Sequence, residues 1–224
     1  MTSRRKHDAW PPTRDRDRTA RARIRDAAIA RFAEHGIAAT RLKAIAEDVG
    51  VSQPLVIHHF GSKEGLRRAC DEYVVATIRE GKRASMAAGR GLDPLEAIRK
   101  FQKGPPLLKY LARTLTERSP DVAALIDELL EDAVGYMAEG VDSGLLKPSE
   151  YPRARAAVLL LWQLGALVLH EHAERLMGVD LTGDADQLMD WWMPAAEILA
   201  KGVLDETFYE QWRAKTQTQA AKHQ

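Results

Sequence analysis

Apolar side chains recur every three or four positions through almost all of the 224-residue chain, and this spacing limits most strongly what the chain can fold into. Strand-like alternation is absent, and no Asn-Gly or Asp-Gly pair joins two apolar runs. Glycine and proline separate the periodic segments at positions where helices commonly end and begin. The sequence therefore predicts an all-α fold.

The boundaries of the expected helices follow from capping residues, glycine and proline. In the N-terminal part, helices are expected at about 19–35, between an N-cap at Thr40 and Gly50, at 52–60, and from Lys63 onward. A glycine- and alanine-rich segment at 81–91 is interpreted as a flexible connection. Beyond it, the expected helices are 93–103, 105–118, 120–144, 152–177, 184–202 and 205–215.

Charge is distributed unevenly along the chain, although the net charge is only +1. Residues 1–70 hold 15 Lys/Arg against 8 Asp/Glu, whereas residues 71–224 hold 18 against 24. A basic N-terminal part joined to an acidic remainder is typical of a protein that meets a polyanion with one end.

Cysteine content and hydropathy indicate the compartment. The single cysteine, Cys70, cannot form an internal disulfide, which suits a reducing environment. The longest apolar run, 156–169, is shorter than the roughly 20 residues that cross a bilayer, and no apolar segment opens the chain. We therefore expect a cytoplasmic protein with no membrane partner.

The segment 40–60, TRLKAIAEDVGVSQPLVIHHF, has the pattern of a helix-turn-helix. Two short helices flank a turn at Gly50, and Ala46 and Val49 of the first should pack against Val56 and Phe60 of the second. The N-terminal part of the second helix would then enter a major groove of duplex DNA. A cation at the start of the helix that begins at Lys63 opposes the helix dipole, and a bound phosphate would resolve that conflict.

Three stretches resemble the tetracycline-repressor (TetR) family: FAEHG at 32–36, IAEDVGVS at 45–52 and HFGSKEGL at 59–66, with Thr40 between the first two. The resemblance covers about residues 19–80 and implies an operator-binding homodimer whose C-terminal helices hold a small-molecule effector. Ile57 stands where the family usually has a tyrosine that touches DNA. The expected DNA-binding residues are Thr40, Arg41, Lys43, Ser52, Gln53, Pro54, Leu55, His58, His59 and Lys63.

Three parts follow from these patterns. Residues 1–17 have almost no apolar side chains and are predicted to be a mobile basic arm. Residues 18–64 would form a three-helix DNA-binding domain that contains the helix-turn-helix. Residues 65–224 would form a larger helical domain for effector binding and dimerisation.

Aromatic, Met and a few polar side chains on the later helices suit a cavity for an apolar or amphipathic effector. The expected ligand-binding residues are Tyr73, Phe101, Leu108, Tyr110, Leu111, Tyr136, Met137, Trp162, Gln163 and His170. More apolar surface is present than one subunit would cover, which favours a dimer. The expected interface residues are Leu159, Leu188, Trp191, Trp192, Ala195 and Leu199.

The preferred function is a sequence-specific, ligand-responsive transcriptional regulator, more often a repressor than an activator, acting on a palindromic operator. Two alternatives remain open: a helical small-molecule carrier or sensor without DNA recognition, and a helical enzyme that uses the same pocket. His170 and Glu174 share a helix face but lack a third metal ligand, and no phosphate-binding or dinucleotide-binding motif is present. No catalytic residue, metal or cofactor is expected.

Overall fold

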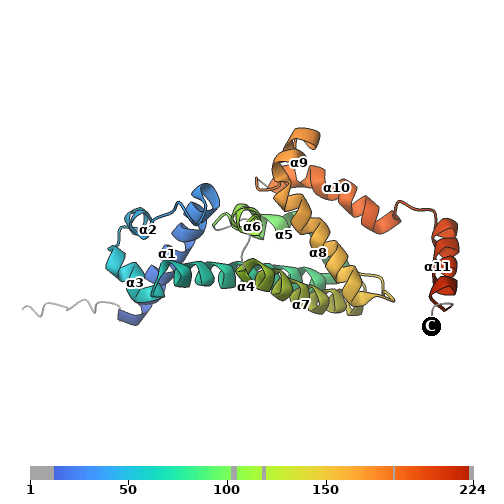
Figure 1. Ribbon diagram of the computed structural model, residues 1–224, viewed down its shortest axis with the longest axis horizontal. Coiled ribbons are helices and arrows are strands. Elements are labelled where there is room, and N and C mark those ends of the chain that lie inside the picture. Colours follow the sequence, from blue (N-terminus) through green and yellow to red (C-terminus); the bar gives the residue numbers. More distant parts are fainter. Residues whose placement is uncertain (1–12, 102–104, 118–119, 184, 222–224) are drawn as a thin grey trace, which may run out of the picture.

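The computed structural model describes residues 13–101, 105–117, 120–183 and 185–221 (Figure 1). All regular secondary structure in these ranges is helical, which confirms the predicted fold class. The elements in chain order are α1 (Thr13–His35), α2 (Leu42–Asp48), α3 (Gln53–Phe60), α4 (Lys63–Ala88), η1 (Gly89–Gly91), α5 (Pro94–Phe101), α6 (Leu107–Leu115), α7 (Pro120–Asp142), α8 (Pro152–Val168), α9 (His170–Met177), α10 (Ala185–Lys201) and α11 (Glu206–Ala221).

The molecule is elongated, and α4 runs along much of its length (Figure 1). Helices α1, α2 and α3 gather around the N-terminal half of α4, and α7 packs along its C-terminal half. Helix α6 packs against both α1 and α8, between the two ends of the molecule. Helix α11 stands at the end opposite the N-terminal helices.

Helix α1 begins earlier than expected, at Thr13 rather than about residue 19, so the predicted arm is partly helical. In the sequence of this first stretch, arginine and aspartate alternate, which places opposite charges three positions apart, as at Asp15 and Arg18. Residues 1–12 of the predicted arm lie outside the described residues.

The segment 81–91, expected to be a flexible connection, is instead mostly the last two turns of α4, which ends only at Gly89 with a φ of +55°. Alanine-rich sequence has high helix propensity, and packing against α7 offsets the cost of Gly81. The approach is close, since a Cβ added to Gly140 of α7 would lie 2.7 Å from Sδ of Met86. The hydroxyl of Ser143 also donates to the carbonyl of Met86 at 2.7 Å.

The segment expected as one helix at 152–177 is divided into α8 and α9, which meet at an angle of 77° around Leu169. In the part of the chain that the structure describes, no single helix combines the length and apolarity needed to cross a membrane. Helices α8 and α9 reach that length only together, across their bend.

The N-terminal helices and the first half of α4 share one core. Ile24, Ala28 and Phe32 form the buried face of α1, as their spacing predicts. Val56 of α3 is fully buried in the same cluster, and Ala46 of α2 and Val49, just after α2, pack there with Phe60, as expected. Cys70 of α4 lies within this core as a small apolar group, and burial raises the pKa of its thiol.

Tyr110 of α6 joins this core to the C-terminal part. The side chain is 1% exposed, its ring centroid lies 6.4 Å from that of Phe32, and its hydroxyl donates to Oδ1 of Asp71 at 2.6 Å. Arg67 of α4 also pairs with Glu117, just after α6, at 3.1 Å. Burial raises the pKa of Asp71, because desolvation disfavours the carboxylate.

A second core lies between α4, α6, α7 and α8. Val75 of α4, Leu111 of α6, Leu129 of α7 and Leu164 of α8 are buried together there. At the edge of this core, Arg79 donates to Asp132 at 2.6 Å and to Glu128 at 2.8 Å, which ties α4 to α7. The two cores make one continuous body along α4.

The bond between Tyr110 and Asp71 yields a stability prediction. Tyr110→Phe should lower the free energy of unfolding by about 1–3 kcal/mol, because a buried carboxylate loses its hydrogen bond. Asp71→Asn should cost less, since the amide oxygen still accepts and the desolvated charge is removed. Because the folded-state pKa of Asp71 is raised, the parent should gain stability relative to Asp71→Asn as pH falls through that pKa.

Urea denaturation between pH 7 and pH 4 measures both effects. Tyr209→Phe, at an exposed tyrosine of α11, is the matched control and should leave stability unchanged. An Asp71→Asn variant that loses as much stability as Tyr110→Phe would contradict this account.

Candidate functional site

The helix-turn-helix is held by α1. Arg31 of α1 forms an ion pair with Asp48 of α2, and this hydrogen bond lowers the pKa of the Asp48 carboxyl. Arg23 donates to the carbonyl of Val49 at 2.6 Å. Gly50 takes a φ of +67° in the turn, a conformation that side chains other than glycine rarely adopt. Thus α2 and α3 are fixed as a unit on α1.

Helix α3 buries one face and exposes the other. Val56 is fully buried, whereas Gln53, Pro54, Ile57 and His58 are exposed. The exposed residues lie on the same helix at positions 53, 54, 57 and 58, the spacing of a single face. Pro54 is in the first turn, where the missing N–H costs little. The structure therefore presents most of the expected base-reading residues together.

The other expected contacts on α3 differ in exposure. Leu55 is half-buried, and Ser52 is exposed as the N-cap of the helix. His59 is half-buried, with its ring centroid 6.2 Å from that of Phe60 and 5.6 Å from that of His58. His59 therefore packs at the base of the exposed face.

The structure corrects the expectation that Thr40 is an N-cap and a phosphate contact. Thr40 is buried, and its hydroxyl donates to the carbonyl of Gly36 at 2.8 Å, which fastens the loop between α1 and α2. The N-cap of α2 is Arg41, without a side-chain capping bond. Arg41 and Lys43 are both exposed, and Lys43 lies 3.8 Å from Glu47.

Lys63 has a structural partner as well. Its Nζ donates to the carbonyl of Ala38 at 3.1 Å, in the loop that Thr40 fastens. Ser62 caps α4 by accepting from the amide of Gly65. A cation at the start of α4 is therefore explained by a hydrogen bond to the neighbouring loop, and it does not require a phosphate.

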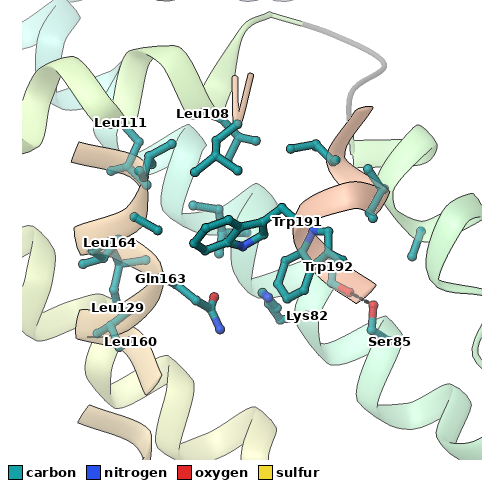
Figure 2. Close-up of a pocket in the computed structure, with 18 of the residues that line it drawn as sticks. Lys82, Ser85, Leu108, Leu111, Leu129, Leu160, Gln163, Leu164, Trp191 and Trp192 are labelled. Carbon is teal, nitrogen blue, oxygen red and sulfur yellow. Dashed lines mark hydrogen bonds between the residues drawn. The ribbon is translucent and has the colours of Figure 1, made fainter. Parts of the chain in front are cut away.

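A cavity of about 250 Å³ lies in the C-terminal part, enclosed by α4, α5, α6, α7, α8 and α10 (Figure 2). Trp191 and Trp192 of α10 form one wall, and Leu160 and Leu164 of α8 face them across the space. Its volume is close to the lower end of the range for small-molecule sites, and its lining is mostly apolar.

The structure brings four of the ten expected ligand-binding residues to this cavity: Leu108, Leu111, Tyr136 and Gln163. Five others do not line it, namely Tyr73, Tyr110, Met137, Trp162 and His170. Tyr73 and Tyr110 pack in the N-terminal core, and Met137 packs in a separate cluster with Tyr136. The side chain of Phe101 lies outside the described residues.

The expected dimer residues are largely inside the subunit, which corrects that prediction. Leu188 and Ala195 are buried, and Trp191 and Trp192 line the cavity. Leu159 is half-buried against the cluster around Met137 and Tyr136. Of the six, only Leu199 is exposed. The apolar face of α10 is therefore largely used to close the cavity.

Few polar groups line the cavity, and three of them were not expected from the sequence: Lys82, Ser85 and Asp132. Lys82 of α4 reaches between Gln163 and Trp192, with Nζ 5.7 Å from the centroid of the Trp192 ring (Figure 2). Asp132 of α7 lines the same space and is bound to Arg79. Lys82 could have been found only by assigning 81–91 to a helix. Among the described residues, no group of His, Cys, Asp and Glu is arranged to hold a metal ion.

Two family models match the chain. Residues 24–70 match the model described as bacterial regulatory proteins, tetR family, and residues 102–205 match the tetracyclin repressor-like C-terminal domain. The chain belongs to the TetR family. It is a DNA-binding transcriptional regulator and not an enzyme.

A relative and several solved structures agree with this assignment. The HTH-type transcriptional regulatory protein RaaS of Mycobacterium tuberculosis is 39% identical over 209 residues, which cover 91% of this chain and 96% of that protein. The fold is similar to a full-length TetR regulator, TylP, of Streptomyces fradiae, with a TM-score of 0.55 at 23% identity, covering 80% of this chain and 84% of that one. A TetR-family regulator of Pectobacterium atrosepticum gives a TM-score of 0.53 at 21% identity, covering 87% and 99%.

The placement of Leu188 yields a prediction for this TetR-family chain. Leu188→Asp should lower the melting temperature by many degrees, because it buries a charge without a partner at a cost of several kcal/mol. Leu176→Asp, at a leucine of α9 that is 70% exposed, is the matched control and should melt close to the parent. If Leu188→Asp melts like the parent but dissociates into monomers, Leu188 lies in the dimer interface and not in the core of the subunit.

Proposed function

We propose that this protein is a ligand-responsive repressor that binds a palindromic operator as a homodimer. The observation that carries the proposal is α6, which places Leu108 and Leu111 in the cavity wall and Tyr110 in the core of the helix-turn-helix. Any shift of α6 on ligand binding would reach the DNA-binding helices directly. The helix-turn-helix and the cavity thus belong to one continuously packed structure.

Recognition of DNA would rest on the exposed face of α3. Gln53 can form paired hydrogen bonds with adenine, and Pro54 and Ile57 offer apolar atoms for a thymine methyl group. Ile57 gives no hydroxyl to a phosphate, so backbone contacts would come from basic side chains beside α3. Arg41 and Lys43 are exposed on α2 and suit that role.

Substitutions on α2 and α3 should separate base reading from phosphate binding. Gln53→Ala should change which sequence is preferred. Arg41→Ala should weaken all duplexes similarly and make the slope of log K against log salt shallower by about one. Arg90→Ala, an exposed arginine in η1, is the control for loss of one positive charge.

Fluorescence anisotropy with selected and scrambled duplexes measures these effects. If no duplex binds in a salt-dependent way, the protein is the carrier or sensor without DNA recognition. If Gln53→Ala keeps the preference of the parent, α3 does not read the bases through Gln53.

A second copy of the chain would cover the exposed apolar strip of α8. Val158, Leu161 and Val168 lie on one face at a spacing of three and seven residues, and Leu161 is 60% exposed. Met193, which is 62% exposed, and Leu199 are further exposed apolar residues on α10. Helix α11, at the C-terminal end of the molecule, also exposes three aromatic side chains: Phe208, Tyr209 and Trp212. Such extended apolar surface is typical of an interface rather than of a monomer.

Leu161→Asp should therefore give folded monomers with much weaker operator binding, because two recognition helices about 34 Å apart must engage together. Light scattering measures the assembly, and anisotropy measures the affinity. Ala123→Asp, on an exposed position of α7, should remain dimeric. A parent that is monomeric at micromolar concentration would refute the homodimer.

Coupling between ligand and DNA requires different ligand affinities in the two states, since a ligand that binds both equally shifts nothing. Helix α4 extends from Ser62, its cap beside the helix-turn-helix, to Lys82 and Ser85 in the cavity wall. With α6 it forms a second connection between the sites. Both helices would have to move for the distance between recognition helices to change.

A further inference from the structure

Lys82 is the unusual feature of the cavity. Among the described residues, no carboxylate lies within ion-pair distance of its Nζ, and its one contact of electrostatic kind is the face of Trp192. Its surroundings are apolar, and burial lowers the pKa of its ammonium group. The side chain is half-buried, and an ammonium group that is partly removed from water without an ion-pair partner is costly, so an anionic ligand would stabilise it.

The other charged group of the cavity does not satisfy Lys82. Asp132 accepts from Arg79 at 2.6 Å, and Arg79 is also shared with Glu128. That cluster joins one guanidinium to two carboxylates on the side of α4 and α7, next to the cavity. Lys82 and Asp132 are the two charged residues of the lining, and among the described residues only Asp132 has a salt bridge.

We propose that the effector is an amphipathic carboxylate whose acidic group pairs with the ammonium of Lys82 and whose apolar body fills the space between α8 and α10. This inference rests on the proposed effector site and narrows the expected apolar or amphipathic effector to an amphipathic anion. Gln163 lies beside Lys82 and offers an amide donor to the same carboxylate (Figure 2). Trp191, Trp192 and Leu164 would cover the apolar body.

The size of the cavity limits the ligand. At about 30 Å³ for a water-sized group, 250 Å³ holds on the order of eight to ten non-hydrogen atoms. Octanoate is of this size and carries one carboxylate. 1-Octanol and octylammonium have the same number of carbon atoms with a neutral or a positive head group, so the three compounds present different charges to Lys82.

The experiment is calorimetric titration of the full chain, without DNA, with octanoate, 1-octanol and octylammonium. Octanoate should bind the parent about 10- to 100-fold more tightly than 1-octanol, the ratio expected for a hydrogen-bonded ion pair. Lys82→Met should remove that advantage and leave 1-octanol binding unchanged or stronger. Lys109→Met, which removes an exposed lysine of α6, should bind all three as the parent does.

Melting curves test the same proposal independently of any ligand. Lys82→Met should fold and melt at or above the temperature of the parent, since it removes a half-buried charge that has no ion-pair partner among the described residues. A clear loss of stability would mean that Lys82 has a structural partner, and would overturn the proposal.

The other outcomes separate this inference from the proposed function. Equal binding of octanoate and 1-octanol, or a preference for octylammonium, would overturn the anionic ligand while leaving the effector cavity in place. Absence of binding by all three compounds at millimolar concentration would overturn both the anionic ligand and the effector cavity. The DNA-binding role is measured separately by the duplex titrations.

Discussion

Tyr110 is buried where α6 meets α1 and α4, with its ring against Phe32 and its hydroxyl on Asp71. Leu107 of α6 is buried in the same core, and Arg67 pairs with Glu117 just after α6. Tyr110 is the largest of these side chains and the one whose hydroxyl needs a buried acceptor. The position of the helix-turn-helix relative to the cavity therefore depends on how α6 packs around Tyr110.

Within the DNA-binding end, too, a few specific side-chain contacts fix the positions of the helices. The ion pair between Arg31 and Asp48 fixes α2 on α1. Hydrogen bonds from Thr40 and Lys63 fix the loop between α1 and α2, and the buried side chain of Val56 fixes α3. Some polar residues that the sequence suggested as DNA contacts therefore position the helices instead. What remains exposed on α3 is a small surface in which one amide side chain, Gln53, accompanies apolar and imidazole groups.

The local sequence pattern was sufficient to predict the all-α fold and the helix-turn-helix, because apolar spacing, Gly50 and Pro54 determine structure within a few residues. The same pattern was insufficient to predict the cavity. The helical state of 81–91 depends on packing against α7, and the inward side of Trp191 and Trp192 depends on how α10 packs on α5 and faces α4 and α8 across the cavity. Apolar residues look alike in a sequence whether they face a cavity, a core or a second subunit. Leu188 and Leu199, on the same helix, illustrate this, since one is buried and the other exposed.

The walls of the cavity are unequal in their attachments. Helices α4 and α6 each also belong to the core under the helix-turn-helix, whereas no described residue of α10 belongs to that core. In the proposed ligand response, a change on the first two walls would alter both the shape of the cavity and its coupling to DNA binding, but a change on the third would alter only the shape. New ligand specificity, whether selected in evolution or designed for a biosensor, is therefore most accessible through α10, where residues can be exchanged without disturbing the transmission of the response.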